Sequence, residues 1–136
     1  MHYLGSCKCK QWKLRVSTDE ALGNLNPRVC DCEYCKSHPS AIISGSDMQI
    51  EFLGDRENIT IDINGDELAL FYRCKACGDL LAVGCEIDGQ LRGAVNSSLL
   101  DRKDLLGSSV AIQPRLLSAS EKMQRWGKLW GKLNGV

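Results

Sequence analysis

The sequence predicts a mostly β fold in one small domain, with a short helical segment near the C-terminus. Two observations favour this fold class. Several segments alternate apolar and polar residues with a period of two, as half-buried strands do. Three cysteine clusters have the close spacing that thiolate metal sites need. At 136 residues, the chain is long enough for one hydrophobic core, which bound metal would help to stabilise.

Six segments have the pattern of strands. The first three alternate apolar with charged or polar residues and are 11–16, 48–52 and 59–63. Gly54-Asp55 and Asn64-Gly65 supply turns, because Gly and Asn accept a positive φ at little cost. The last three segments are 68–73, 80–85 and 91–95. The third cysteine cluster lies between two of these, so we expect it at the tip of a hairpin, as in a zinc knuckle.

The C-terminal segment has a different period. Ser118 is a candidate N-cap, and the apolar residues that follow it have helical spacing: Met123, Trp126, Trp130 and Leu133. Glycines at 127, 131 and 135 weaken this helix, each by roughly 1 kcal/mol relative to alanine. We expect the helix to pack on the sheet or to form a dimer contact. A basic amphipathic helix on a membrane surface or on nucleic acid is the alternative.

Seven of the eight cysteines lie in Cys-x-Cys or Cys-x-x-Cys arrays: Cys7, Cys9, Cys30, Cys32, Cys35, Cys74 and Cys77. Residues one or two apart can aim both sulfurs at one point about 2.3 Å away, which is the zinc–sulfur bond length. The same spacing is poor for a disulfide, which needs Cα atoms roughly 4.4–6.8 Å apart and matched Cβ directions. The clusters therefore indicate metal binding.

Compartment and charge narrow the class of protein. The N-terminal residues have no apolar run typical of a signal peptide, and no stretch approaches the roughly 18 apolar residues of a membrane span. We therefore expect a cytoplasmic protein, in which thiols stay reduced. The 17 basic residues balance the 17 acidic residues, so we expect no nucleic-acid partner.

The seven clustered cysteines divide into four and three. A closed structural zinc site takes four ligands, whereas a catalytic site takes three and leaves a position for water or substrate. The two pairs, Cys7/Cys9 and Cys74/Cys77, would join distant parts of the chain, as a structural site does. The middle cluster, with Cys30, Cys32 and Cys35, would hold a second metal on one side. Zinc is favoured over an iron–sulfur cluster, since three cysteines would need a further ligand to close such a cluster.

The three motifs, in this order and with this spacing, resemble the glutathione-dependent formaldehyde-activating enzyme family, which includes the centromere protein V-like domain. The motifs are Gly5-Ser-Cys7-Lys-Cys9, Cys30-x-Cys32-x-x-Cys35 and Cys74-x-x-Cys77-Gly78, and the resemblance extends roughly from Gly5 to Arg125. It implies a zinc-stapled, mostly β fold of two short antiparallel sheets over residues 1–136. It also implies a structural zinc on Cys7, Cys9, Cys74 and Cys77 and an active-site zinc on Cys30, Cys32 and Cys35.

The activity that the resemblance implies is a carbon–sulfur lyase reaction on an adduct of a small thiol, such as glutathione, and an aldehyde, such as formaldehyde. Similar sequences usually carry His where this chain has Asp31, and Ser-Gly-Ala where it has the run that begins at Ser37. Both departures border the second metal, so the identities of the thiol and the aldehyde stay open. The alternative function is a non-catalytic zinc-binding interaction module. A homodimer is compatible with either function.

Several single residues have two interpretations. Arg28 and Lys36 flank the middle cluster and could hold a carboxylate, although solvated surface charge explains them as well. His38 or Asp31 could close the second metal site, which would favour the module over the enzyme. Cys85 alternates with Val83 and is expected to be a small buried apolar residue.

Overall fold

The computed structural model describes residues 1–30, 41–63, 68–112 and 116–136. Most of its elements are strands, and α2 (Ala119–Leu129) is the α-helix of the described residues. The strands are β1 (His2–Ser6), β2 (Lys13–Ser17), β3 (Arg28–Cys30), β4 (Ile42–Ile43), β5 (Gln49–Leu53), β6 (Ile59–Ile63), β7 (Leu70–Cys74), β8 (Leu80–Ile87), β9 (Gln90–Asn96), β10 (Val110–Ile112) and β11 (Gly131–Asn134). Short 3-10 helices are η1 (Leu22–Asn24), η2 (Arg56–Asn58), η3 (Ser97–Leu99) and η4 (Lys103–Leu105).

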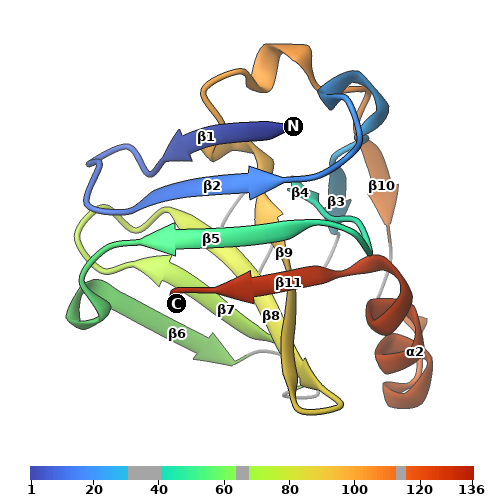
Figure 1. Ribbon diagram of the computed structural model, residues 1–136. Helices are drawn as coiled ribbons and strands as arrows, with labels where there is room; N and C mark the ends of the chain where they lie inside the picture. Colours follow the sequence, from blue (N-terminus) through green and yellow to red (C-terminus); the bar gives the residue numbers. More distant parts are fainter. Residues whose placement is uncertain (31–40, 64–67, 113–115) are drawn as a thin grey trace.

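The strands form one hydrogen-bonded network. Its main path runs β1-β2-β5-β11-β9-β4-β3-β10, and β8 and β7 connect β6 to β9. Figure 1 shows β1, β2, β5 and β11 side by side, with β6, β7 and β8 below them and α2 at the right. The predicted mostly β fold with a C-terminal helix is confirmed. The arrangement differs from two short antiparallel sheets, because the strands are connected and two pairs, β3/β10 and β5/β11, are parallel.

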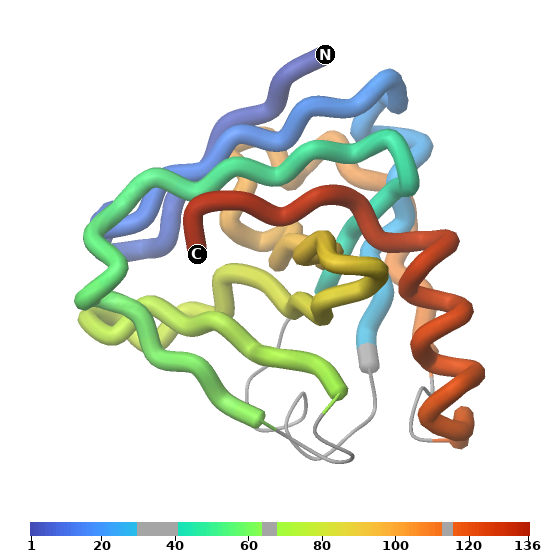
Figure 2. The backbone as a smooth tube through the Cα atoms, turned by 60° about the horizontal axis from the view of Figure 1, so that its bottom comes forward, coloured from blue at the N-terminus to red at the C-terminus, as the bar shows by residue number. Residues whose placement is uncertain are grey.

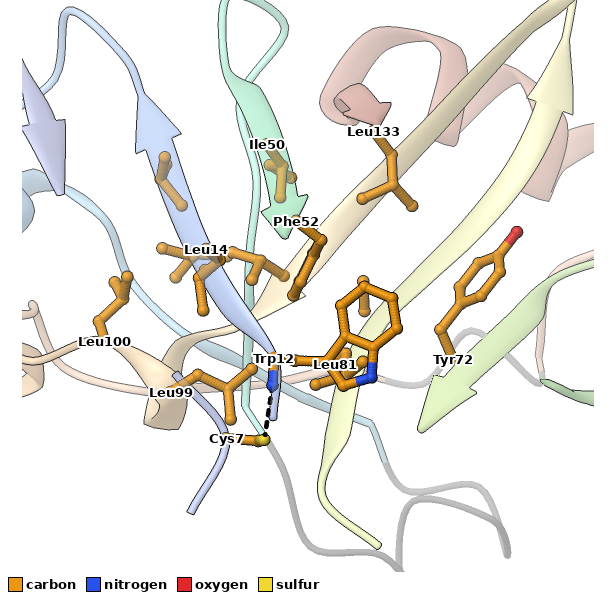
Figure 3. Packing of buried hydrophobic residues seen from close by; sticks show 14 of the residues in the cluster. Cys7, Trp12, Leu14, Ile50, Phe52, Tyr72, Leu81, Leu99, Leu100 and Leu133 are labelled. Carbon is orange, nitrogen blue, oxygen red and sulfur yellow. Dashed lines mark hydrogen bonds between the residues drawn. The ribbon is translucent and has the colours of Figure 1, made fainter. Parts of the chain in front are cut away.

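The main core lies against the alternating strands β2 and β5. Leu14 and Val16 of β2 point inward and lie opposite Phe52 and Ile50 of β5, whereas the charged residues between them face solvent. Figure 3 shows Leu14, Ile50 and Phe52 in the same cluster as Leu81 of β8. Their burial follows the period of two in the sequence, because successive side chains of a strand point to opposite faces.

A second core lies between the sheet and α2. Phe71, Val83 and Cys85 pack there with Trp126 and Trp130, whose rings stack with centroids 4.5 Å apart. Strand β8 contributes to both cores, so it is buried on both faces. That position explains why 80–85 is a continuous apolar run rather than an alternating one. Cys85 is a buried apolar residue here, as predicted.

The helix begins where the sequence predicts and ends earlier. Ser118 and Glu121 form a capping box, in which each side chain accepts a hydrogen bond from the backbone of the other residue. The helical spacing of Trp130 and Leu133 was misleading, because α2 ends at Leu129 and Leu133 lies on β11. Gly131 permits this change, since a Cβ there would lie only 2.2 Å from the carbonyl oxygen of Met48. No helix among the described residues has the length and apolar character needed to cross a membrane.

Candidate metal centre

Two hairpin loops bring four cysteines together. Cys7 and Cys9 lie in the loop between β1 and β2, while Cys74 ends β7 and Cys77 lies in the turn before β8. The first loop turns at Lys10, which has a φ of 62°, and the second turns at Gly78, which has a φ of 80°. The cluster therefore joins chain segments that are far apart in the sequence, at the tip of the predicted β7–β8 hairpin.

The distances between the sulfurs fit a tetrahedral metal site. The four Sγ atoms of Cys7, Cys9, Cys74 and Cys77 lie within 4.8 Å of one another. Cys9 Sγ is 3.6 Å from both Cys7 Sγ and Cys74 Sγ. Thiolates bound to one zinc ion at about 2.3 Å lie roughly 3.8 Å apart in a tetrahedron. The four residues predicted to hold a structural metal thus form a cluster that could bind zinc.

The cluster has buried cysteines on the side of the core and an exposed cysteine on the side of the solvent. Cys7 and Cys74 are each only 1% exposed, whereas Cys9 is exposed. The backbone N–H of Trp12 donates to Cys7 Sγ at 3.4 Å (Figure 3). Burial raises the pKa of the Cys7 and Cys74 thiols, and hydrogen bonds from backbone N–H groups partly offset that rise. Without metal, these two thiols are therefore protonated at neutral pH.

Asp79 ties the two loops together beside the sulfurs. Its carboxylate accepts a hydrogen bond from the backbone N–H of Lys8 at 2.8 Å, and Lys8 Nζ lies 3.7 Å from the same carboxylate. The backbone contact holds the Cys7/Cys9 loop against the β7–β8 hairpin without help from metal. Asp79 was not predicted from the sequence as part of the site, although its place just after Cys77-Gly78 was the available signal.

The middle cluster is only partly within the described residues. Cys30 ends β3, but its side chain, all of Cys32 and Cys35, and Asp31, Lys36 and His38 lie outside the described residues. In both backbone views, the end of β3 lies across the molecule from the β1–β2 and β7–β8 loops (Figures 1 and 2). The second zinc on Cys30, Cys32 and Cys35 therefore stays a prediction, separate from the four-cysteine cluster.

Arg28 is half-buried two residues before Cys30 and donates a hydrogen bond to the Ser44 hydroxyl. Burial lowers the pKa of its guanidinium, and the positive charge of Arg125 on α2 lowers it further. The group stays cationic at neutral pH, because the guanidinium of arginine is far too basic to lose its proton in a protein. Arg28 thus differs from an ordinary solvated surface residue.

A solved structure has a similar fold. A protein from Rhodobacter sphaeroides, determined as a structural genomics target, superimposes with a TM-score of 0.60 and 20% sequence identity. The match covers 80% of this chain and 99% of that chain. A similarity at this level of sequence identity supports a shared fold but gives no evidence about function. No family model matches the chain, and no curated protein matches it in sequence.

Freshly purified protein is expected to contain at least one zinc ion per chain and at most two, with one in the four-cysteine cluster. Because Cys7 and Cys74 are protonated in the metal-free protein, zinc binding releases their protons. The zinc affinity should therefore decrease as the pH is lowered, by about tenfold per pH unit for each proton released. Elemental analysis and chelator competition at several pH values test this. Metal-free protein with disulfides among these four cysteines would contradict it.

Proposed function

We propose that this protein is a zinc-dependent enzyme of the carbon–sulfur lyase type, related to the glutathione-dependent formaldehyde-activating family. Its substrate would be the adduct of a small thiol and a small aldehyde. The reaction would take place at a metal held by Cys30, Cys32 and Cys35. The single domain would span residues 1–136.

The observation that supports this proposal best is the way the cysteines are divided. Cys7, Cys9, Cys74 and Cys77 gather around one point and satisfy a four-coordinate site among themselves. The backbone of Cys30, at the end of β3, lies on the other side of the molecule, and four thiolates need no further ligand to complete such a site. A second metal with three thiolate ligands would keep one position for a substrate.

A zinc ion with three thiolate ligands supplies a soft, weak Lewis acid that suits the binding of a thiol better than the formation of hydroxide. In the direction of adduct formation, the S–H bond of the thiol breaks and its sulfur forms a bond to the aldehyde carbon. The carbon–oxygen π electrons move to the oxygen, which takes up a proton in place of the one that the thiol loses. The reverse reaction breaks the carbon–sulfur bond. Arg28 would hold a carboxylate of the thiol substrate, because its cationic guanidinium lies close in sequence to Cys30 and can bind a carboxylate through two parallel hydrogen bonds.

A cytoplasmic location fits this chemistry, and we propose it as well. None of the cysteines whose side chains the structure describes forms a disulfide, and a reducing compartment would keep both sets of ligands as thiols or thiolates.

The protein should accelerate the approach to equilibrium between a low-molecular-weight thiol and a small aldehyde, as followed by NMR after mixing. Cys32→Ser should reduce that rate to the rate in buffer and lower the second zinc, while the fold and the first zinc survive. The fold is expected to survive because the ligands of this cluster lie within one short stretch of chain. A metal that links residues so close in sequence adds little to the free energy of unfolding. Cys85→Ser is the matched control, since it changes a cysteine in the second core and should keep the rate.

Two results would argue against the proposal. A rate equal to that in buffer, with the second zinc present and several thiols tested, would favour the non-catalytic interaction module. Unfolding of Cys32→Ser would show instead that the middle cluster is structural.

A further inference from the structure

Among the described strands, only β7 pairs with β6, which leaves the other edge of β6 without a strand partner there. Among the described residues, β1, β6 and β10 each pair with a single strand of the sheet. The outer side of β1 is partly covered, because Gly5 bridges to Leu100 and the backbone N–H of Asp101 donates to the Leu4 carbonyl at 2.9 Å. β10 has only three residues. β6 has five residues, pairs only with β7 among the described strands and lies at the lower left of the molecule in Figure 1.

The five described residues of β6 do not themselves carry the usual protection against pairing. Natural edge strands carry lysine, proline or a bulge, or they are very short. β6 reads Ile59-Thr60-Ile61-Asp62-Ile63, in which Ile61 is 49% exposed and Ile63 is 59% exposed. Its single charged residue, Asp62, forms an ion pair with Arg73 of the neighbouring strand at 2.7 Å. The strand therefore offers backbone hydrogen-bonding groups and branched apolar side chains with little net charge.

The sequence of β6 is chemically self-complementary. When a second copy of β6 runs antiparallel with Ile61 on the two-fold axis, Ile59 lies opposite Ile63 of the second copy. Thr60 then lies opposite Asp62 of the second copy, so a hydroxyl meets a carboxylate. A register centred on Asp62 would instead place two carboxylates opposite each other, which is unfavourable. Only the register centred on Ile61 pairs all five residues without facing like charges.

We propose that two copies of this chain associate through their β6 strands, antiparallel and with Ile61 on the two-fold axis, to extend the sheet across the dimer. The contact is isologous, so it closes on itself and does not continue into a fibre. A five-residue edge buries less surface than the roughly 800 Å² per partner of a standard stable interface. The dimer is therefore expected to form at micromolar or higher protein concentration.

Sedimentation of the zinc-loaded full chain, from micromolar to near-millimolar concentration, tests the association. The mass should rise from 15.0 kDa towards twice that value. Ile61→Lys should weaken the dimer by about tenfold or more, because two lysines would then face each other. Leu53→Lys is the matched control: Leu53 is 75% exposed at the end of β5, and its replacement should leave the dimer unchanged.

The register has its own test. With oxidised glutathione as the acceptor of both thiol hydrogens, Ile61→Cys should form a disulfide between the two new cysteines, detected by peptide mass spectrometry. Ile63→Cys should not, since the two residues 63 would lie roughly 13 Å apart along the strands. A monomer at all concentrations, a dimer insensitive to Ile61→Lys, a mass that grows beyond the dimer, or equal cross-linking of the two cysteine variants would overturn the proposal.

Discussion

Cys74→Ser is expected to leave the chain largely unfolded or aggregated. The substitution removes a buried ligand from the cluster that joins the β1–β2 loop to the β7–β8 hairpin. Structural zinc contributes on the order of 10 kcal/mol to folding in small zinc domains. The net stability of a typical domain is only about 5–15 kcal/mol, so the loss of this metal would consume most of it. Thermal melts and zinc counts on the same preparation measure both effects.

The matched control for this variant is Cys85→Ser. Cys85 is also a buried cysteine, but it lies in the second core, with its sulfur 3.6 Å from Met123 Sδ, and not among the four clustered sulfurs. This control should lose some stability from its buried hydroxyl and keep the full zinc content. If Cys74→Ser kept both its zinc and its melting temperature, the four-cysteine cluster would not be a structural metal site.

Trp12→Ala is expected to destabilise the protein by about 3–5 kcal/mol, the usual cost of deleting a large buried ring. Trp12 is fully buried and lies edge-on to Phe52 of β5, with ring centroids 6.4 Å apart. Its indole N–H donates to the Asn58 carbonyl at 2.9 Å, and its backbone N–H donates to Cys7 Sγ. Trp12 thus connects the core, η2 and the four-cysteine cluster. The melting temperature should fall by roughly 10–20 °C.

Two further variants separate the contributions of Trp12. Trp12→Phe keeps most of the apolar volume and loses the indole hydrogen bond. Because the Asn58 carbonyl also accepts from Lys75 N–H, it would keep a partner, so this cost should be smaller, about 1 kcal/mol. Leu53→Ala, at an exposed position, should change stability by no more than about 0.5 kcal/mol. Equal melting temperatures for Trp12→Ala and Leu53→Ala would show that the core does not depend on Trp12.

The strands that the sequence predicted are those whose burial follows the alternation of their residues. All six are present, with bounds shifted by at most a few residues. Of the strands that it missed, all but β1 are short or depend on distant partners. β1 has five residues and pairs with the neighbouring β2, but its residues do not follow the alternation, since Leu4 is 58% exposed and the buried position is Gly5. β3, β4 and β10 have two or three residues each, too few to show a period of two. β11 was missed because its Leu133 also fits the helical spacing from Trp126, and only its pairing with β5 and β9 makes this segment a strand.

The four-cysteine cluster could be predicted because thiolate coordination depends on local spacing. Cys-x-Cys and Cys-x-x-Cys place two sulfurs on one side of a loop whatever the rest of the fold does. The supporting contacts could not be predicted in the same way. The hydrogen bond from Lys8 to Asp79 depends on how the two hairpins are placed in space, and no local pattern carries that information.

The position of β11 has a consequence for the order of folding. This strand follows every other strand in the chain, yet it lies in the interior of the sheet, parallel to β5 and antiparallel to β9. It is the hydrogen-bonded link between the group β1-β2-β5 and the remaining strands of the described sheet. Hairpins such as β1–β2 and β8–β9 can form early from local contacts, but the sheet becomes continuous through β11 only when Lys132 reaches Gln49. Such distant contacts are slow to form, so assembly of the complete sheet is a late step that requires residues 131–134 to be in place.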